Sequence, residues 1–343
     1  MTTLPAQARD EATPDTARLG SRLPTALEPV FEGDWPIVAT DSRDLLSWLL
    51  DEGVEAQHFS HLADLTPDER RNVLVVPTTV DGAPDPDRWR ELFAESRLLI
   101  VPGVAFDPSM EAMRYTLRRL AEASINDAVE RNTRVLNAVA QAESVLVTSG
   151  GHEMRCRFDE VTILRPKIEP ELERGEWESI GAYFEVGLVS EPDEFMANVK
   201  PGFHVDGEFL VNGVSVACHR HVSNDVRAMS TAAWTLLRDV HRDGGFPLRI
   251  TLDHSVVRSI MTGQGRDLVS DLLPHTNAGL GGVLTELSFS TNSTLRPDGI
   301  DWTINSQMNE GALGVHVAIG EGLTGAHVDF IATGATSDIT PAP

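Results

Sequence analysis

Cysteine is nearly absent from this chain, because only Cys156 and Cys218 occur among its 343 residues. Two cysteines supply neither the disulfide framework of a small secreted domain nor a cysteine-type zinc site. Long apolar runs are also missing, and no stretch is long enough to cross a bilayer. The first residues do not show the pattern of a signal peptide. We therefore expect a cytoplasmic protein without a membrane partner.

Basic residues are scarce as well. The 28 lysines and arginines face 52 aspartates and glutamates, so the formal net charge is −24. A surface this acidic repels phosphate backbones, which argues against a nucleic-acid partner. No G-x-G-x-x-G or P-loop pattern follows any of the apolar runs, so nothing supports nucleotide binding.

The first half of the chain predicts an α/β domain. Residues 1–32 have a composition typical of a flexible N-terminal arm. Residues 33–143 alternate apolar runs with helical patterns, beginning with a strand at 36–40 and a helix that Ser42 caps and Gly53 ends. Such alternation is typical of a parallel sheet covered by helices.

The pattern changes at Ser144. From there to residue 343 short alternating runs dominate, with one long helical stretch at 225–245. The predicted fold class is therefore an α/β N-terminal domain followed by a β-rich α+β domain.

Histidines and carboxylates interrupt the last apolar strands. His316 lies in "GVHVAIG", while His327 and Asp329 are two residues apart in "HVDFIATG" and so share one face of a strand. Glu286 stands in the otherwise uncharged "VLTELSFST", where an unpaired carboxylate would be costly. Two imidazoles and two carboxylates suit Zn²⁺, Fe²⁺, Mn²⁺ or Co²⁺. A hydrogen-bonded network without metal is the alternative. A second cluster, in "CHRH" at 218–221, is explained equally well by alternation at a strand end.

Three segments in order, "LTELSFSTN", "NEGALGVHVAIG" and "HVDFI", resemble the C-terminal signature of the thermophilic-type metalloaminopeptidases, the aminopeptidase T or leucyl aminopeptidase family. The resemblance implies a metalloaminopeptidase-T-like architecture and puts Glu286, His316, His327 and Asp329 on metal-ligand positions. Members of that family commonly associate through the β-rich domain, so the resemblance also implies a homodimer.

The sequence departs from that family at two positions. Gly202–Phe203–His204 stands where the family has a metal-bridging glutamate, and Leu323 stands where it has a catalytic-site tyrosine. A two-metal peptidase needs a bridging carboxylate to hold its ions around an activated water. The 2,5-dihydroxypyridine 5,6-dioxygenases resemble the same family but use a single non-haem iron. This chain keeps the His-x-Asp pair of those enzymes and adds His316.

These features favour a mononuclear non-haem iron oxygenase that acts on a small aromatic or amino-acid-derived substrate. It would hold one divalent ion, Fe(II) in preference to Zn, Co or Mn, with His204 as the catalytic proton-transfer residue. One alternative is a metal-dependent aminopeptidase that acts on a short peptide and has rebuilt its second metal site with His204. The other is a non-catalytic peptide-binding accessory protein of a biosynthetic pathway.

Overall fold

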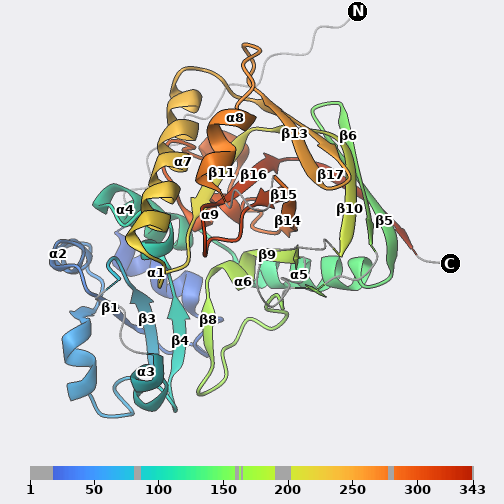
Figure 1. Cartoon of the computed structure of the whole chain (residues 1–343). Helices are drawn as coiled ribbons and strands as arrows, with labels where there is room; N and C mark the ends of the chain where they lie inside the picture. Colours follow the sequence, from blue (N-terminus) through green and yellow to red (C-terminus); the bar gives the residue numbers. More distant parts are fainter. Residues whose placement is uncertain are drawn as a thin grey trace, which may run out of the picture.

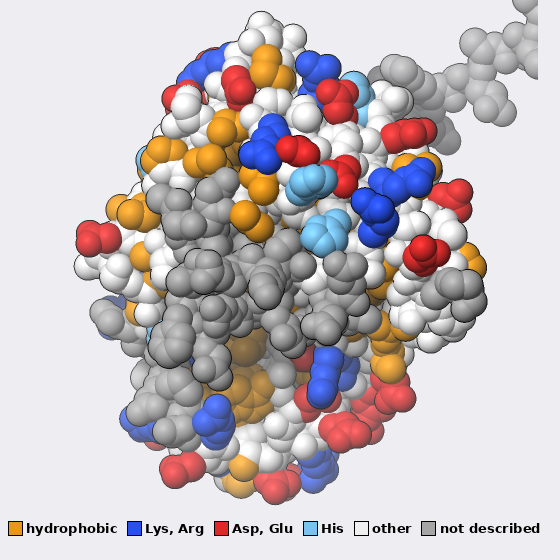
Figure 2. All heavy atoms as spheres, turned by 45° about the vertical axis from the view of Figure 1, so that its right-hand side comes forward, with side chains coloured by type: hydrophobic (Ala, Val, Ile, Leu, Met, Phe, Trp, Pro, Cys, Tyr) orange, Lys and Arg blue, Asp and Glu red, His pale blue; other side chains and the backbone are white. Residues whose placement is uncertain are grey.

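The computed structural model describes residues 18–80, 86–158, 162–163, 165–189, 202–276 and 282–341. Within these residues the strands form one five-stranded and two six-stranded sheets. Figure 1 shows the five-stranded sheet with its helices at one end of the molecule and the two larger sheets at the other. Acidic and basic side chains are interspersed on the face seen in Figure 2.

The first sheet is parallel, as the strand–helix alternation predicts. Its order is β2 (Ala56–His58), β1 (Ile37–Thr40), β3 (Asn72–Val76), β4 (Arg97–Ile100) and β8 (Trp177–Ser179). Every residue of β3 is buried, as is typical of a parallel strand that is covered on both faces. One face packs on α2 (Arg43–Asp51), α4 (Met110–Leu120) and α5 (Ile125–Val139), and the other packs on α3 (Pro86–Leu92).

Local sequence explains where the predicted helix begins. The Ser42 side chain accepts a hydrogen bond from the backbone N–H of Leu45, which satisfies one of the unpaired donors at the start of α2. Gly53 follows the helix with a φ of 78°, a conformation that favours glycine. Both end signals of this helix are therefore confirmed.

A helix forms where the sequence predicts an arm. Residues Leu19–Leu27 make α1, and Leu19, Leu23 and Leu27 are buried against the first sheet's helices. Their spacing of four places them on one face, so the leucines gain enough apolar burial to order this segment. The arm expected over residues 1–32 is thus wrong for 19–27, and its first seventeen residues lie outside the described part of the chain.

The two halves of the chain are not separated at residue 144. Strand β8 completes the parallel sheet by pairing with β4. The core beneath that sheet also includes Tyr183, Phe184 and Met308 from the second half. A boundary drawn from the change of pattern alone therefore misses how far the β-rich half reaches into the first core.

The second half contains two antiparallel sheets, in line with the predicted β-rich region. One has the order β13 (Val256–Met261), β12 (Leu248–Asp253), β10 (Phe203–Val211), β6 (His152–Phe158), β5 (Ala142–Ser149) and β17 (Thr336–Pro341). The other has the order β11 (Gly213–Ala217), β16 (His327–Thr333), β15 (Gly314–Ile319), β14 (Leu284–Ser290), β9 (Glu185–Val189) and β7 (Thr162–Ile163).

The largest core lies between these two sheets and also receives side chains from α7 (Asn224–Arg242). Three single-turn helices complete the second half: α6 (Gly181–Phe184), α8 (Val269–Leu272) and α9 (Gln307–Glu310). Among the described residues, no helix is both long and apolar enough to cross a membrane.

Candidate metal centre

The sheet that contains β14, β15 and β16 has one apolar and one polar face. On β14, Leu287 and Phe289 belong to the core between the two antiparallel sheets, whereas Glu286, Ser288 and Ser290 alternate with them and lie on the opposite face. The strand register extends this polar face across the neighbouring strands, where it carries Glu185, His316, Asp329 and Ser215. The centre of this sheet lies beside α9 in Figure 1.

The four ligands predicted from the sequence lie together on this face. His327 Nε2 is 3.0 Å from Asp329 Oδ1 and 3.5 Å from Glu286 Oε2. His316 Nε2 is 3.6 Å from Glu286 Oε1 and 3.9 Å from Asp329 Oδ1. Both imidazoles therefore point the same ring nitrogen at the same two carboxylates.

Two further carboxylates belong to the cluster. Glu185, the first residue of β9, has its Oε2 atom 3.7 Å from His316 Nε2. Glu310, at the end of α9, is linked to Asp329 through Ser215, whose hydroxyl is 3.0 Å from Glu310 Oε2 and 2.9 Å from Asp329 Oδ2. Each had a weak signal in the sequence, an acid at the edge of an apolar run in "YFEVGLV" and in "NEGALGVHVAIG".

The six side chains divide into two groups of three. One consists of Glu185, Glu310 and His316, and the other of Glu286, His327 and Asp329; in each, the potential ligand atoms lie within 4.8 Å of one another. Each group thus supplies two carboxylates and one imidazole, the ligand types that Zn²⁺, Mn²⁺, Fe²⁺ and Co²⁺ accept.

Three atoms of the cluster are buried without a hydrogen-bond partner among the described residues. They are His316 Nε2, Glu185 Oε2 and Asp329 Oδ1. Leaving a buried polar group unpaired costs about 1–3 kcal/mol, so three unpaired atoms in one place require an explanation. Both oxygens lie within 3.9 Å of the nitrogen, and a divalent cation between such atoms would satisfy all of them. The residues present therefore fit a metal ion.

Electrostatics support the same interpretation. Burial and the neighbouring Glu286 charge together raise the pKa of Glu185 to about 8. Burial, together with the charge of Asp329, raises the pKa of Glu310 well above its usual value. Carboxylates thus repel one another in a region with little solvent, and a bound cation would remove that repulsion.

The imidazoles compensate part of this negative charge. Burial opposes their charged forms, yet the nearby Glu286 carboxylate raises the pKa of His316, and the Asp329 charge raises that of His327. For Glu286 burial acts in the opposite direction to the two imidazoles, which together lower its pKa. The cluster thus contains four carboxyl groups and two imidazoles, and a bound cation would favour the ionised form of each carboxyl group.

The side chains of the cluster differ in their exposure. The side chains of Glu185, Glu286 and His327 are 16%, 10% and 20% exposed, whereas His316 and Asp329 are at most 1% exposed.

The structure does not bring His204 into this cluster. His204 is an exposed residue of β10, paired with Arg157 of β6 in the other six-stranded sheet. Its predicted catalytic role thus receives no support from geometry. The "CHRH" segment also lies outside the cluster: His219 and His221 are exposed beyond the end of β11, and Cys218 is a buried free thiol.

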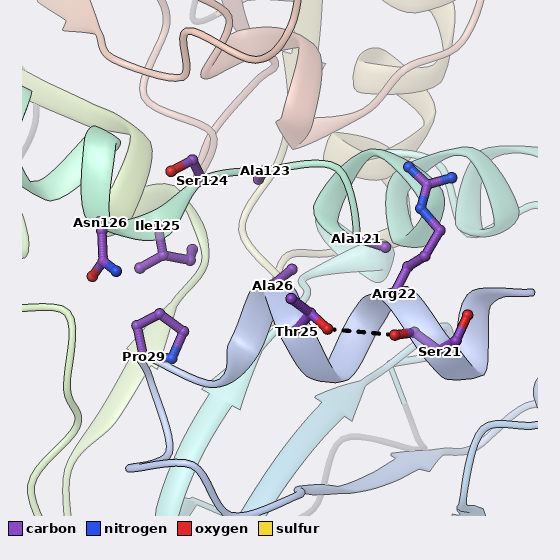
Figure 3. A pocket seen from close by; sticks show the side chains of 10 residues that line it. All are labelled: Ser21, Arg22, Thr25, Ala26, Pro29, Ala121, Ala123, Ser124, Ile125 and Asn126. Carbon is purple, nitrogen blue, oxygen red and sulfur yellow. Dashed lines mark hydrogen bonds between the residues drawn. The ribbon is translucent and has the colours of Figure 1, made fainter. Parts of the chain in front are cut away.

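Other hollows and acidic groups are poorer candidates. Figure 3 shows a groove of about 420 Å³ between α1 and the turn from α4 to α5, where Arg22 is the one charged lining side chain. A second groove, of about 480 Å³, lies mainly along α4 and is lined by arginines, glutamates, a tyrosine and an isoleucine, with no histidine among its described lining residues. A third group of potential ligands, Asp206, Asp253 and His254, is largely exposed, and Arg258 pairs with Asp253.

The chain was compared with protein families and with solved structures. The family model described as crocagin biosynthetic protein CgnE/B matches residues 32–340. AmpT from Thermus thermophilus is 11% identical with a TM-score of 0.49, covering 94% of this chain and 95% of its own. The 2,5-dihydroxypyridine dioxygenase from Pseudomonas putida is also 11% identical, with a TM-score of 0.50, covering 94% of this chain and 93% of its own. No curated protein matches the chain.

The dioxygenase likeness extends over nearly the whole chain and concerns the fold. It confirms the predicted fold class, an α/β region followed by a β-rich region. The dioxygenases are one of the two groups of proteins that the sequence resembles. At this low identity it assigns no activity.

Proposed function

Because the chain belongs to the family of crocagin biosynthetic proteins CgnE/B, we propose that it is a divalent-metal-dependent enzyme of a biosynthetic pathway. One observation carries this proposal. His316 Nε2, Glu185 Oε2 and Asp329 Oδ1 are buried without a hydrogen bond, and both oxygens lie within 3.9 Å of the nitrogen. Without a cation these atoms would have only ion-pair contacts of 3.0 to 3.9 Å in place of hydrogen bonds.

The carboxylate-rich composition favours hydrolysis over oxygen chemistry. Two adjacent groups, each with two carboxylates and one imidazole, are the donor set of a two-ion hydrolytic site. A bound pair of divalent ions would supply Lewis acidity and lower the pKa of water at the site. The metalloaminopeptidases have a bridging glutamate where this chain has Gly202–Phe203–His204. Glu185 and Glu310 would supply carboxylates in its place. The proposed reaction is cleavage of an amide or ester bond in a small molecule or short peptide.

The protein itself would orient the substrate and limit the access of water. Glu185, Glu286 and His327 form the least buried edge of the cluster, so a carboxylate on this edge would attract a cationic substrate group such as an amine. Ser215 connects Glu310 with Asp329 and so keeps the two ligand groups in fixed relation. His316 and Asp329, fully buried behind this edge, are shielded from bulk water.

An iron-dependent oxygenase is the second candidate, and one observation favours it. Asp329 Oδ1 lies 3.0 Å from His327 Nε2 and 3.9 Å from His316 Nε2, which is the two-histidine, one-carboxylate ligand set of many non-haem iron enzymes. In that case a single Fe(II) would occupy the site, and Glu185 and Glu310 would face it without binding it.

The experiment that tests this proposal is elemental analysis of tag-free protein, followed by reloading of metal-stripped protein with Zn²⁺, Co²⁺, Mn²⁺ or Fe²⁺. About two equivalents of zinc or cobalt, with cleavage of aminoacyl amides or esters, would support the hydrolase. One equivalent of iron, with O₂ uptake in the presence of dihydroxylated aromatics, would favour the oxygenase instead. Protein that takes up none of these ions would refute both enzymes and favour a non-catalytic binder.

Two variants make the experiment specific to this cluster. Asp329→Asn keeps the shape of a ligand shared between the imidazoles and is expected to abolish or strongly weaken metal uptake. Asp253→Asn changes an exposed carboxylate in the third, peripheral group and is expected to leave it unchanged.

A further inference from the structure

Ser290 makes two hydrogen bonds at the inner end of the cluster. Its side chain, on the last residue of β14, is 2% exposed. The Oγ atom donates to the backbone carbonyl of Glu310 at 2.7 Å and lies 3.0 Å from His316 Nδ1. One hydroxyl therefore contacts two of the three residues in the Glu185–Glu310–His316 group.

The hydrogen-bond inventory of a hydroxyl fixes which atom donates to which. A serine has one proton to give and can accept two, and a backbone carbonyl can only accept. Because Ser290 gives its proton to the Glu310 carbonyl, the bond to His316 requires that Nδ1 carries the proton. The neutral His316 ring then has its lone pair on Nε2, the atom directed at Glu185, Glu286 and Asp329.

His327 reaches the same state by a different route. Its Nδ1 lies 2.8 Å from the backbone carbonyl of Gly320, which forces Nδ1 to donate without help from any side chain. The other members of its group depend on other hydroxyls: Ser288 donates to Glu286, and Ser215 contacts Asp329. The two ligand groups are thus oriented by separate sets of serines, apart from the link through Ser215.

Ser290 also holds the backbone that presents Glu310. This residue ends the single-turn helix α9, which is too short to be rigid by itself. The hydrogen bond from Ser290 to its carbonyl ties the end of α9 to the buried sheet. Loss of the hydroxyl would therefore release the carboxylate as well as the ring orientation.

We propose that Ser290 is a positioning residue for the Glu185–Glu310–His316 group and determines whether this group binds an ion, independently of the Glu286–His327–Asp329 group. The inference rests on the proposed function, because it requires that both groups bind metal. Ligand-orienting hydrogen bonds of this kind commonly change metal affinity about 10–100-fold when removed.

The test is a Zn²⁺ titration of the full-length, metal-stripped chain by calorimetry, with elemental analysis of the saturated protein. Ser290→Ala is expected to weaken one of the two binding events about 10–100-fold and to leave the other unchanged. Ser288→Ala, two residues earlier on the same buried face, is expected to weaken the other event. Ser290→Thr keeps a hydroxyl and is expected to recover the lost event at least in part.

A control separates metal binding from loss of stability. Ser255 is also fully buried, and its hydroxyl donates to Phe203 and accepts from Val205 in the other sheet. Ser255→Ala should therefore lower thermal stability while both binding events keep wild-type affinity. If Ser290→Ala binds two ions as tightly as wild type, the inference is wrong although the proposed function stands. If wild type itself binds no ion, the proposed function fails first.

A second measurement needs no variant. In Zn²⁺-loaded protein with ¹⁵N-labelled histidine, the long-range nitrogen spectrum should show His316 with a protonated Nδ1 and a metal-bound Nε2. A spectrum with metal on Nδ1 and the proton on Nε2 would overturn the assignment even if Ser290→Ala failed to fold.

Discussion

Glu310 is a buried carboxylate next to other buried carboxylates, which is an unfavourable position for it in the absence of a cation. Asp329 and Glu185 both contribute to raising its pKa, and its side-chain partner among the described residues is the hydroxyl of Ser215. Such repulsion is tolerated where a bound ion removes it. Replacing Glu310 should therefore affect the stability of the metal-free protein and its affinity for metal in different ways.

Glu310→Gln keeps the shape of the side chain and its hydrogen bond to Ser215 but removes one of four acidic groups. We expect the free energy of unfolding of the metal-free protein to stay the same or to rise by up to about 1 kcal/mol, because the substitution removes a repelled buried acid and creates no cavity. Metal affinity should fall by about tenfold or more, since one ligand loses its charge. Denaturant unfolding with and without Zn²⁺ measures both; unchanged metal affinity would show that Glu310 is not a ligand.

His204→Ala tests the residue that the sequence put forward as catalytic. Because His204 is exposed and belongs to the other six-stranded sheet, we expect metal binding and turnover of any substrate found to match wild type. The stability change should stay within about 0.5 kcal/mol, as is usual at the surface. A clear drop in turnover with normal metal content would restore the predicted proton-transfer role.

At the scale of elements, strand β14 shows how one segment serves two purposes. Its odd-numbered residues Leu287 and Phe289 fill the core, and its even-numbered residues Glu286, Ser288 and Ser290 face the cluster. All seven residues of the strand are buried, so the polar face is enclosed and not a solvent face. Enclosure explains why every polar atom there needs either a partner or an ion.

Helix α1 supplies the element-scale prediction. Leu23 is fully buried among the helices of the first core, whereas Thr25 is exposed on the same helix. Leu23→Ala should lower the free energy of unfolding by about 2–5 kcal/mol, because it leaves a cavity. Thr25→Ala, the matched control, should change it by less than about 0.5 kcal/mol. Equal and small effects in chemical denaturation would mean that α1 does not pack on the folded protein.

The whole molecule depends on contacts between its two halves. Strand β8 from the second half completes the parallel sheet, and Tyr183, Phe184 and Met308 lie in the core under it. These connections mean that the candidate metal centre and the α/β region share structure, since Phe184 directly precedes the candidate ligand Glu185.

A fragment of residues 144–343 should therefore not fold like the intact chain. It would expose the apolar side chains of Tyr183, Phe184 and Met308 to water, which favours aggregation. We expect the fragment to be rapidly degraded in limited proteolysis and to lack the cooperative unfolding of the full chain. A soluble, protease-resistant fragment that binds Zn²⁺ would contradict this and establish residue 144 as a true domain boundary.

The sequence by itself determined the features that depend on near neighbours. The capped helix α2, the alternation of the strands and the shared face of His327 and Asp329 all follow from the spacing of residues along the chain. The ligand types of Glu286 and His316 likewise stand out against the apolar residues around them.

Tertiary structure decided which distant segments meet. Glu185 reaches His316 because β9 is the neighbour of β14, and Glu310 reaches Asp329 because Ser215 of β11 lies beside β16. Sheet order depends on pairing between strands that are far apart in the sequence, which a local pattern does not encode. For the same reason the sequence could not show that β10 carries His204 into the other sheet, away from the candidate metal centre.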